Sequence, residues 1–172
     1  MNIFVLHPNP RKCAQMHCDK HVVKMILEHC QLMYTAIHEL APEHLPDGAY
    51  KKTHVNHPCA KWVRASKHNF VWLLLLTYWL CQEKKYRYGG KRHKCEDHLR
   101  PLLQACKNIH WPKITFTPWA IANPYKHMKP IDSYRHYYLN DKQHLLQYKI
   151  RQPPQWCHQD VFTSHTLCNT FQ

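Results

Sequence analysis

Glycine is scarce in this chain, and its scarcity limits the possible folds more than any other feature of the sequence. The 172 residues contain only three glycines, at positions 48, 89 and 90, whereas proline occurs twelve times. Tight turns between β-strands depend on glycine for backbone conformations with positive φ, so a sheet of several strands would need more of it. Most prolines fall between stretches of apolar periodicity, where they separate helices. The sequence therefore predicts an all-α fold.

Four helices are predicted from the apolar periodicity and its boundary signals. Asn9 and Pro10 match an N-cap followed by proline at the first helical position, and that helix should run to about Leu40, with a bend near Asp19. The remaining helices are expected over residues 59–86, 95–109 and 133–150. The connections, above all residues 110–131, are rich in proline and should be mostly irregular.

A single compact domain of residues 1–172 is expected, because this length supports one core and is short for two ordinary domains. Residues 2–6 should form a short strand or an extended N-terminal arm that tucks the amino terminus into the body. The longest apolar run, residues 70–81, has twelve residues, whereas a helix needs about 20 to cross a bilayer. The run therefore predicts a buried core helix and no membrane segment.

The excess of basic residues indicates a polyanionic partner. Lysine and arginine number 24 against 11 aspartates and glutamates, which gives a formal net charge of +13 and a pI near 9.4. The basic residues are spread along the chain, and this balance favours DNA ahead of a membrane surface. The alternative is a basic surface that serves solubility alone. No obligate protein partner is evident from the sequence.

The nine cysteines are expected to be reduced thiols, most of them in the core. Their number is odd and no C-x-x-C pair occurs, which argues against a disulfide framework or a zinc ribbon. The first residues, MNIFVLHPNPRK, have a short hydrophobic run and no cleavage site, unlike a signal peptide. Together these features predict an intracellular protein in a reducing compartment, the cytoplasm or nucleus of a host cell.

The segment CDKHVVKMILE, residues 18–28, raises the question of function because one face of the predicted helix is reactive. At 100° per residue, that face collects His17, His21, Lys24 and Glu28, opposite a face of apolar residues. Three interpretations are open for it. The face could be solvated with incidental histidines, it could bind zinc, or it could place a carboxylate beside an amine for acid–base chemistry on a nucleic acid.

The zinc alternative uses His17 and His21, whose i, i+4 spacing lets two imidazoles reach one ion, with Glu28 as a further ligand. A third protein ligand would have to come from His54, from His57 or from the tail of residues 157–168, none of which has a diagnostic spacing. Apart from zinc in this alternative, no cofactor is expected. The sequence has no phosphate-binding glycine loop and no dinucleotide fingerprint.

CDKHVVKMILE resembles a segment of the endonuclease V-type pyrimidine-dimer DNA glycosylase/AP lyases, small helical DNA-repair enzymes of phages and bacteria. The match places Asp19 and His21 on the motif's Asp and His, and Glu28 on its catalytic glutamate. Two further blocks are similar to family blocks and follow in the same order. They are THVNHPCAKWVR (53–64), which gives Asn56, His57 and Pro58, and KIRQPPQW (149–156), which gives Lys149 and Trp156. The first segment is also similar to one in uncharacterised proteins of large DNA viruses and phages.

The resemblance implies that an α-amine attacks C1′ of a damaged nucleotide, forms a Schiff base and lets the strand break by β-elimination, while Glu28 handles the protons. An α-amine has an ordinary pKa of about 7.7–8.0, against about 10.4 for lysine, which suits a neutral nucleophile. Asn2 is too bulky for efficient removal of the initiator methionine, so Met1 is the expected nucleophile, with Lys24 as the alternative amine. His21 and Lys24 are expected to hold the substrate. Leu27 and Gln31 stand where the phage enzyme has two DNA-binding arginines.

Further DNA contacts are predicted from the basic clusters and the matched blocks. The candidates are Asn56, His57, Arg64, Lys91, Arg92, Arg135, Lys149 and Trp156. Lys91 and Arg92 belong to KKYRYGGKRHK (84–94), where cations and tyrosines alternate as in loops that follow phosphates and stack on bases. A solvated helix end is the alternative for this cluster, and a cap on the core is the alternative for Trp156. A non-catalytic DNA-binding protein also remains open.

Overall fold

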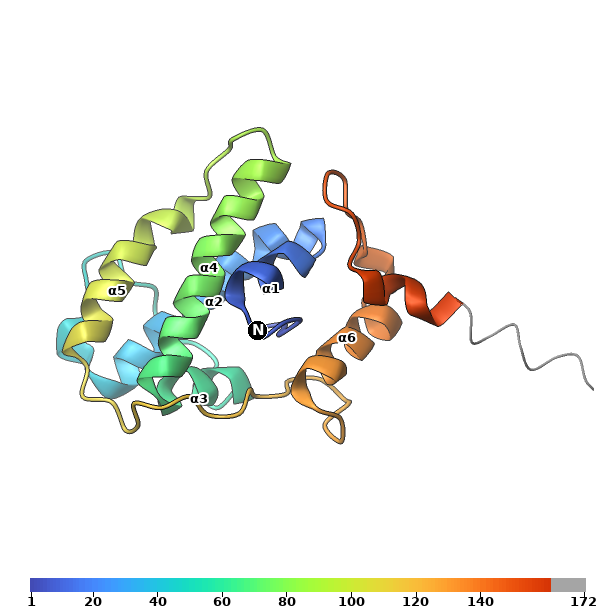
Figure 1. The fold of residues 1–172 in the computed structure, drawn as a ribbon. Helices are drawn as coiled ribbons and strands as arrows, with labels where there is room; N and C mark the ends of the chain where they lie inside the picture. Colours follow the sequence, from blue (N-terminus) through green and yellow to red (C-terminus); the bar gives the residue numbers. More distant parts are fainter. Residues whose placement is uncertain (162–172) are drawn as a thin grey trace, which may run out of the picture.

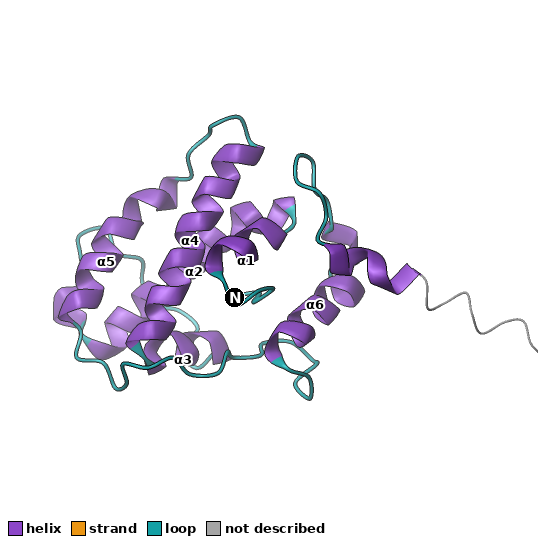
Figure 2. Ribbon diagram, in the orientation of Figure 1, coloured by secondary structure: helices purple, strands orange, loops and turns teal. Residues whose placement is uncertain are grey.

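The computed structural model describes residues 1–161, and the regular elements in this part are helical, without a β-strand (Figure 2). The α-helices are α1 (Pro10–Met16), α2 (Asp19–Leu40), α3 (Pro58–Ala65), α4 (Lys67–Arg87), α5 (Leu99–Asn108) and α6 (Pro130–Asp141). The 3-10 helices are η1 (Pro42–His44), η2 (Lys94–His98), η3 (Gln143–Leu145) and η4 (Gln155–Val161). The prediction of an all-α fold is confirmed. The tail of residues 157–168, considered above as a source of a zinc ligand, lies mostly outside the described residues.

The first two predicted helices are each broken once, and local backbone geometry explains both breaks. His17 and Cys18 are extended, with ψ of 136° and 159°, so the chain changes direction between α1 and α2 where a bend was predicted. Ser66 is extended with ψ of 157°, and its side chain accepts a hydrogen bond from the Asn69 amide, which caps α4. The predicted cap of α1 is confirmed, because Asn9 Oδ1 accepts from the Lys12 amide at 3.1 Å.

The last predicted helix is too long. Residues 133–150 were expected to be helical, but α6 ends at Asp141 and only η3 follows before the chain becomes irregular. Contacts with the α1–α2 junction hold this irregular part. The Asp19 amide donates to the Gln147 carbonyl at 2.9 Å, and the Tyr148 hydroxyl donates to the Met16 carbonyl at 2.9 Å. These long-range bonds replace those that a continued helix would make.

One continuous buried core joins α1 to α5 with α6 and the N-terminal arm. α4 packs against α1 and α2, α5 flanks α4, and the chain start lies between these helices and α6 (Figure 1). The predicted arm is present as an extended segment rather than a strand, and Ile3 to Leu6 are almost completely buried. The arm thereby carries the amino terminus into the body of the protein.

The apolar run at 70–81 forms the middle of α4 and contributes Phe70, Leu73 and Leu76 to the core. Among the described residues, no helix combines the length and apolarity that crossing a membrane requires. The cysteines up to Cys157 are free thiols, and all of these except Cys157 are buried. Their placement agrees with the expectation of core packing.

Candidate active site

Glu28 lies beside the start of the chain. The carboxylate oxygen Oε2 is 3.8 Å from the Met1 α-amine nitrogen and accepts a hydrogen bond of 3.0 Å from the Asn2 main-chain N–H. The Glu28 side chain is only 15% exposed, so the contact is sheltered from bulk solvent. Folding thus brings together a carboxylate from α2 and an amino group that is far from it in sequence.

The N-terminal arm is held in place by several hydrogen bonds. Asn2 Oδ1 accepts from the amides of Ile3 and Phe4 at 2.8 and 3.2 Å, and Asn2 Nδ2 donates to the Ala122 carbonyl at 3.2 Å. Arg135 donates two bonds to the Leu6 carbonyl, at 3.1 and 3.0 Å. Phe4 adopts a φ of +36°, a strained conformation for a bulky residue. These constraints fix the position of the chain start relative to Glu28.

A second amino group approaches Glu28 from its own helix. Lys24 lies one turn earlier in α2, and its Nζ is 3.6 Å from the other carboxylate oxygen, Oε1. The Lys24 side chain is 70% exposed, so it keeps much of its conformational freedom. Glu28 is therefore flanked by two amines, one held in the arm and one on an exposed side chain.

A pocket of about 320 Å³ opens beside this group. Its walls come from the N-terminal arm, α2, the N-cap of α3, the irregular segment before α6, α6 itself and η3. The lining residues are Met1, Asn2, Phe4, His21, Lys24, Met25, Glu28, His57, Ala122, Tyr137, Lys142 and Leu145. The four residues predicted as catalytic, together with His57, are thus brought to one place.

His21 forms part of the pocket wall as a neutral imidazole. Its Nδ1 shares a hydrogen bond of 2.6 Å with the Tyr138 hydroxyl, and its ring stacks on Phe4 with 4.4 Å between ring centroids. Burial is the main cause that lowers the pKa of His21 to about 3, and the nearby His17, Lys142 and Lys24 contribute to the same shift. His21 therefore adds hydrogen-bonding capacity to the pocket at neutral pH, and no charge.

His57 occupies the N-cap of α3. Its Nδ1 accepts a hydrogen bond of 3.2 Å from the Cys59 amide, so the proton of the neutral ring resides on Nε2. Burial lowers the pKa of His57, and the positive charge of the N-terminal amine lowers it as well. His57 consequently offers the pocket an N–H donor.

His17 does not line the pocket and faces the core. Its Nδ1 lies 2.8 Å from the Cys13 carbonyl, which can only accept, so Nδ1 carries the proton. Burial lowers the pKa of His17 to about 3. Within residues 1–161, no three histidine, cysteine, aspartate or glutamate side chains are arranged to hold a metal ion, and this includes the set of His17, His21 and Glu28.

Three arginines predicted to contact DNA use their guanidinium groups within the protein. Arg64 donates to the Val55 carbonyl at 2.7 Å, and Arg135 donates to Leu6 as described above. Arg92 is exposed and pairs with Glu96 at 3.3 Å and with Asp97 at 2.6 Å. Any contact that these arginines make with DNA would have to share or replace these bonds.

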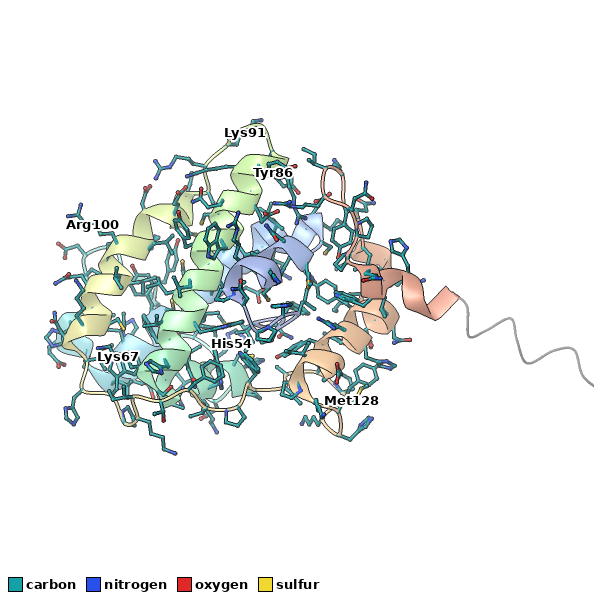
Figure 3. All side chains as sticks on the ribbon, in the orientation of Figure 1. His54, Lys67, Tyr86, Lys91, Arg100 and Met128 are labelled. Atoms are coloured by element: carbon teal, nitrogen blue, oxygen red, sulfur yellow. The ribbon has the colours of Figure 1, made fainter. Side chains whose placement is uncertain are left out.

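Asn56, Lys91 and Lys149 are exposed and lie outside the pocket. Lys91 and Tyr86 lie at the same end of α4, away from Lys67 at the other end (Figure 3). Trp156 is partly buried, edge-on to Tyr138 with ring centroids 6.2 Å apart, and the Arg135 guanidinium lies 5.6 Å from its ring centroid.

A buried ionic network escaped the sequence analysis. Arg87, with a side chain 1% exposed, donates to Asp19 at 3.1 Å and to Glu83 at 3.0 Å, and Arg151 donates to both oxygens of Glu83 at 3.0 and 2.6 Å. Asp19 also accepts from the Lys149 amide at 2.9 Å. The network fastens the segment after α6 to the α1–α2 junction. Glu83 and Arg87 are an i, i+4 pair on α4, but Asp19 and Arg151 join them from 68 positions away, which no local pattern could reveal.

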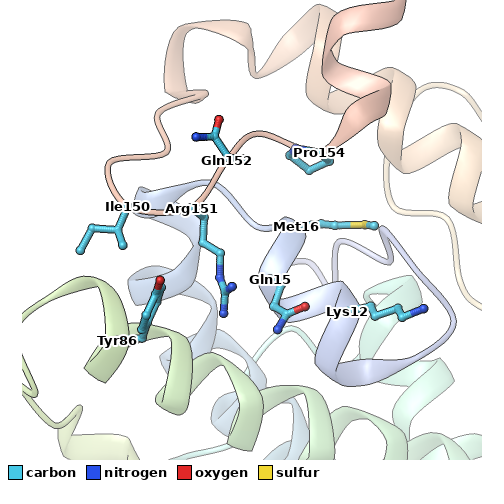
Figure 4. Close-up of a pocket in the computed structure, with 8 residues that line it drawn as sticks. All are labelled: Lys12, Gln15, Met16, Tyr86, Ile150, Arg151, Gln152 and Pro154. Atoms are coloured by element: carbon cyan, nitrogen blue, oxygen red, sulfur yellow. The ribbon is translucent and has the colours of Figure 1, made fainter.

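A larger pocket, of about 530 Å³, lies between α1, the end of α4 and residues 150–154 (Figure 4). Its cationic side chains are Lys12 and Arg151, and Arg151 is already paired with Glu83. The Arg151 guanidinium stacks 4.6 Å from the Tyr86 ring centroid. The pocket contains no pairing of an amine with a carboxylate that is free to act on a substrate, so the Glu28 pocket is the candidate active site.

A helical fold with an α-amine beside a carboxylate is the arrangement that the resemblance to DNA-repair glycosylases predicted. Residues 1–97 match the model of a family described as pyrimidine dimer DNA glycosylase. The match covers more than half of the 172 residues, and the chain belongs to this family. The comparisons with curated proteins and with solved structures gave no match. The resemblance to this family is confirmed, and membership of a DNA glycosylase family implies DNA as the substrate. The matched range contains Met1, His21, Lys24 and Glu28, and it ends before α5.

Proposed function

We propose that the chain is a DNA glycosylase with AP lyase activity, in which the Met1 α-amine is the nucleophile and Glu28 is the general acid and base. The observation that carries this proposal is the distance of 3.8 Å between the Met1 nitrogen and Glu28 Oε2. Both residues line the pocket, and the Glu28 side chain is only 15% exposed. A carboxylate at this distance can accept a proton from the amine and stabilise a cationic imine.

The reaction would proceed in two stages. The amine nitrogen bonds to C1′ of the nucleotide, the glycosidic bond breaks, and the base leaves with its electron pair and a proton. The sugar ring then opens to a Schiff base between C1′ and the amine. Glu28 removes a proton from C2′, the C3′–O bond breaks with release of the 3′ phosphate, and water hydrolyses the imine to regenerate the amine.

Lys24 is the competing nucleophile, because its Nζ is 3.6 Å from Glu28 Oε1. Two features favour Met1. The arm is fixed by the bonds of Asn2, so the α-amine loses little entropy on reaching a reactive geometry, whereas the Lys24 side chain is 70% exposed. In addition, α-amines have lower ordinary pKa values than lysine side chains. Lys24, together with His21, then serves to hold the substrate.

DNA contacts are proposed for the remaining predicted residues: Asn56, His57, Arg64, Lys91, Arg92, Arg135, Lys149 and Trp156. The exposure of Asn56, Lys91 and Lys149 and the place of His57 in the pocket support this assignment. No cofactor is part of the proposal. Elemental analysis of the purified protein would test the zinc alternative, for which stoichiometric zinc that is lost in His17→Ala is the required result.

Borohydride trapping on DNA with an abasic site tests the proposal directly, because reduction of the imine makes the adduct permanent. The wild type should form a covalent adduct that peptide mapping assigns to Met1. Glu28→Gln should slow strand cleavage by about 100-fold or more, in line with the usual contribution of a general acid or base. Glu43→Gln, at a glutamate with a side chain 66% exposed and outside the pocket, is the matched control.

Two substitutions in α2 distinguish the amines. Lys24→Arg should keep the adduct at Met1, and Lys20→Arg, at an exposed position of the same helix, should behave as the wild type. Addition of two residues before Met1 should abolish trapping, because the amine is then displaced from Glu28. An adduct at Lys24, or full activity of the extended chain, would contradict the assignment to Met1.

A further inference from the structure

α6 and the residue after it contribute Tyr137 and Lys142 to the wall of the Glu28 pocket. Both residues lie beyond residue 97, where the family match ends. Membership of the family therefore assigns no role to this side of the pocket. Its chemistry differs from that around Glu28, since it combines an aromatic ring with a cation.

Tyr137 is the outer member of a stack of three rings. The His21 and Phe4 rings have centroids 4.4 Å apart and an interplanar angle of 23°, and the Phe4 and Tyr137 rings follow at 6.0 Å and 9°. Phe4 and His21 are each 4% exposed, whereas Tyr137 is only partly buried. All three rings line the pocket, and Tyr137 is the most exposed of them, so a further flat ring could continue the stack on Tyr137.

Lys142 lies against this outer ring, with Nζ 5.0 Å from the Tyr137 ring centroid. The pocket contains three amino groups, from Met1, Lys24 and Lys142, and one carboxylate, from Glu28. His21 adds no compensating charge. Such a surplus of cationic groups favours an anionic ligand, and a lysine ammonium binds phosphate as a compact point charge.

We propose that Tyr137 and Lys142 form a nucleotide subsite next to Glu28, in which an unstacked base of the DNA strand lies on the Tyr137 ring and the adjoining phosphate binds Lys142. The Lys142 ammonium moves from the ring to the phosphate, and the ring face that it leaves receives the base. This inference rests on the proposed function, because the same pocket receives the sugar. It defines the ligand as a nucleotide with its phosphate rather than a free base, since a free base would leave Lys142 without a partner.

The test is binding of the full chain to duplex DNA that contains one unpaired thymine nucleotide, which keeps both its base and its phosphate, measured by fluorescence anisotropy between 50 and 200 mM salt. Tyr137→Leu should weaken binding by about 5- to 100-fold, the usual effect of losing one base–aromatic stack. Tyr137→Phe keeps the ring and should bind as the wild type. Lys142→Gln should reduce the slope of log affinity against log salt by about one.

Tyr78→Leu and Lys126→Gln are the matched controls, because both residues are exposed and lie outside the pocket. Wild-type affinity in Tyr137→Leu, or a wild-type salt slope in Lys142→Gln, would overturn the subsite, since one nucleotide must engage both residues. The Lys142 variant keeps the test valid if Tyr137→Leu fails to fold. Borohydride trapping separates the two proposals. A wild type that forms no adduct overturns the amine chemistry, whereas a wild type that forms the adduct, together with either of these two unaltered results, overturns the subsite alone.

Discussion

The main-chain N–H of Asn2 donates a hydrogen bond of 3.0 Å to Oε2 of Glu28, across 26 positions of sequence. This bond ties the first peptide of the chain to α2 and leaves the Met1 amine 3.8 Å from the same oxygen. The carboxylate is therefore oriented by the backbone of the residue that follows the amine. An amine held in this way needs no further folding step to meet a substrate sugar in the pocket.

Asn2→Ala should disturb this arrangement, because it removes the acceptor of the Ile3 and Phe4 amides. Each buried N–H left without a partner should lower the free energy of unfolding by about 1–3 kcal/mol. Displacement of the amine should slow borohydride trapping by about 10- to 100-fold at equal amounts of folded protein. Asn9→Ala, which removes the cap of α1, should cost about 1 kcal/mol and leave trapping unchanged. Equal trapping rates in the two variants would contradict a positioning role for Asn2.

Acid should destabilise the fold, because three buried histidines are held neutral. Burial is the main cause that lowers the pKa of His17, His21 and His29 to about 3. In the unfolded chain these side chains bind protons below about pH 6.5, so the free energy of unfolding should fall as the pH drops from 6.5 towards 3. The slope is about 1.4 kcal/mol per pH unit for each histidine. Urea unfolding at a series of pH values measures it, and His29→Gln should make the slope shallower.

Arg87→Met should destabilise the protein strongly, because it leaves the Asp19 and Glu83 carboxylates buried without their shared partner. Removal of one member of a buried ion pair costs about 3–5 kcal/mol. Arg92→Met breaks ion pairs of an exposed arginine and should change the free energy of unfolding little. Urea unfolding of both variants makes the comparison, and similar values would show that the network around Arg87 contributes no more than a surface pair.

Binding to DNA should weaken steeply with salt, as expected for a chain with a formal net charge of +13. If about six phosphates are contacted, the affinity should fall by roughly 1,000-fold between 50 and 200 mM salt. Lys91→Gln should lower the slope by about one if the exposed Lys91 contacts a phosphate, while Lys51→Gln serves as an exposed control outside the predicted contacts. Affinity that does not change with salt would argue against recognition through the phosphate backbone.

The helical class and most of the helices could be predicted from the sequence, because helix periodicity and capping are local properties. The cap at Asn9 and the bend near Asp19 were both predicted and are present. The end of α6 was predicted wrongly, because bonds from Asp19 and Met16 fix residues 147 and 148 in another conformation. Such bonds depend on residues more than a hundred positions away and leave no local signal.

The candidate site likewise combines features that the sequence predicted with features that depend on the tertiary structure. Helix spacing alone aligned His21, Lys24 and Glu28 on one face of α2, and the family resemblance singled out Glu28. The proximity of Met1 to Glu28, the contribution of Tyr137 and Lys142, and the network around Arg87 required the tertiary structure.

The sequence by itself determined that the chain is helical, basic and marked by a reactive face on α2, because backbone preferences and charge are carried by single residues and their near neighbours. Only the tertiary structure decided which amine meets Glu28, which histidines lose their charge, and which rings reach the pocket. Those properties arise from burial and from distances between segments, and both exist only once the arm, α2 and α6 have packed together.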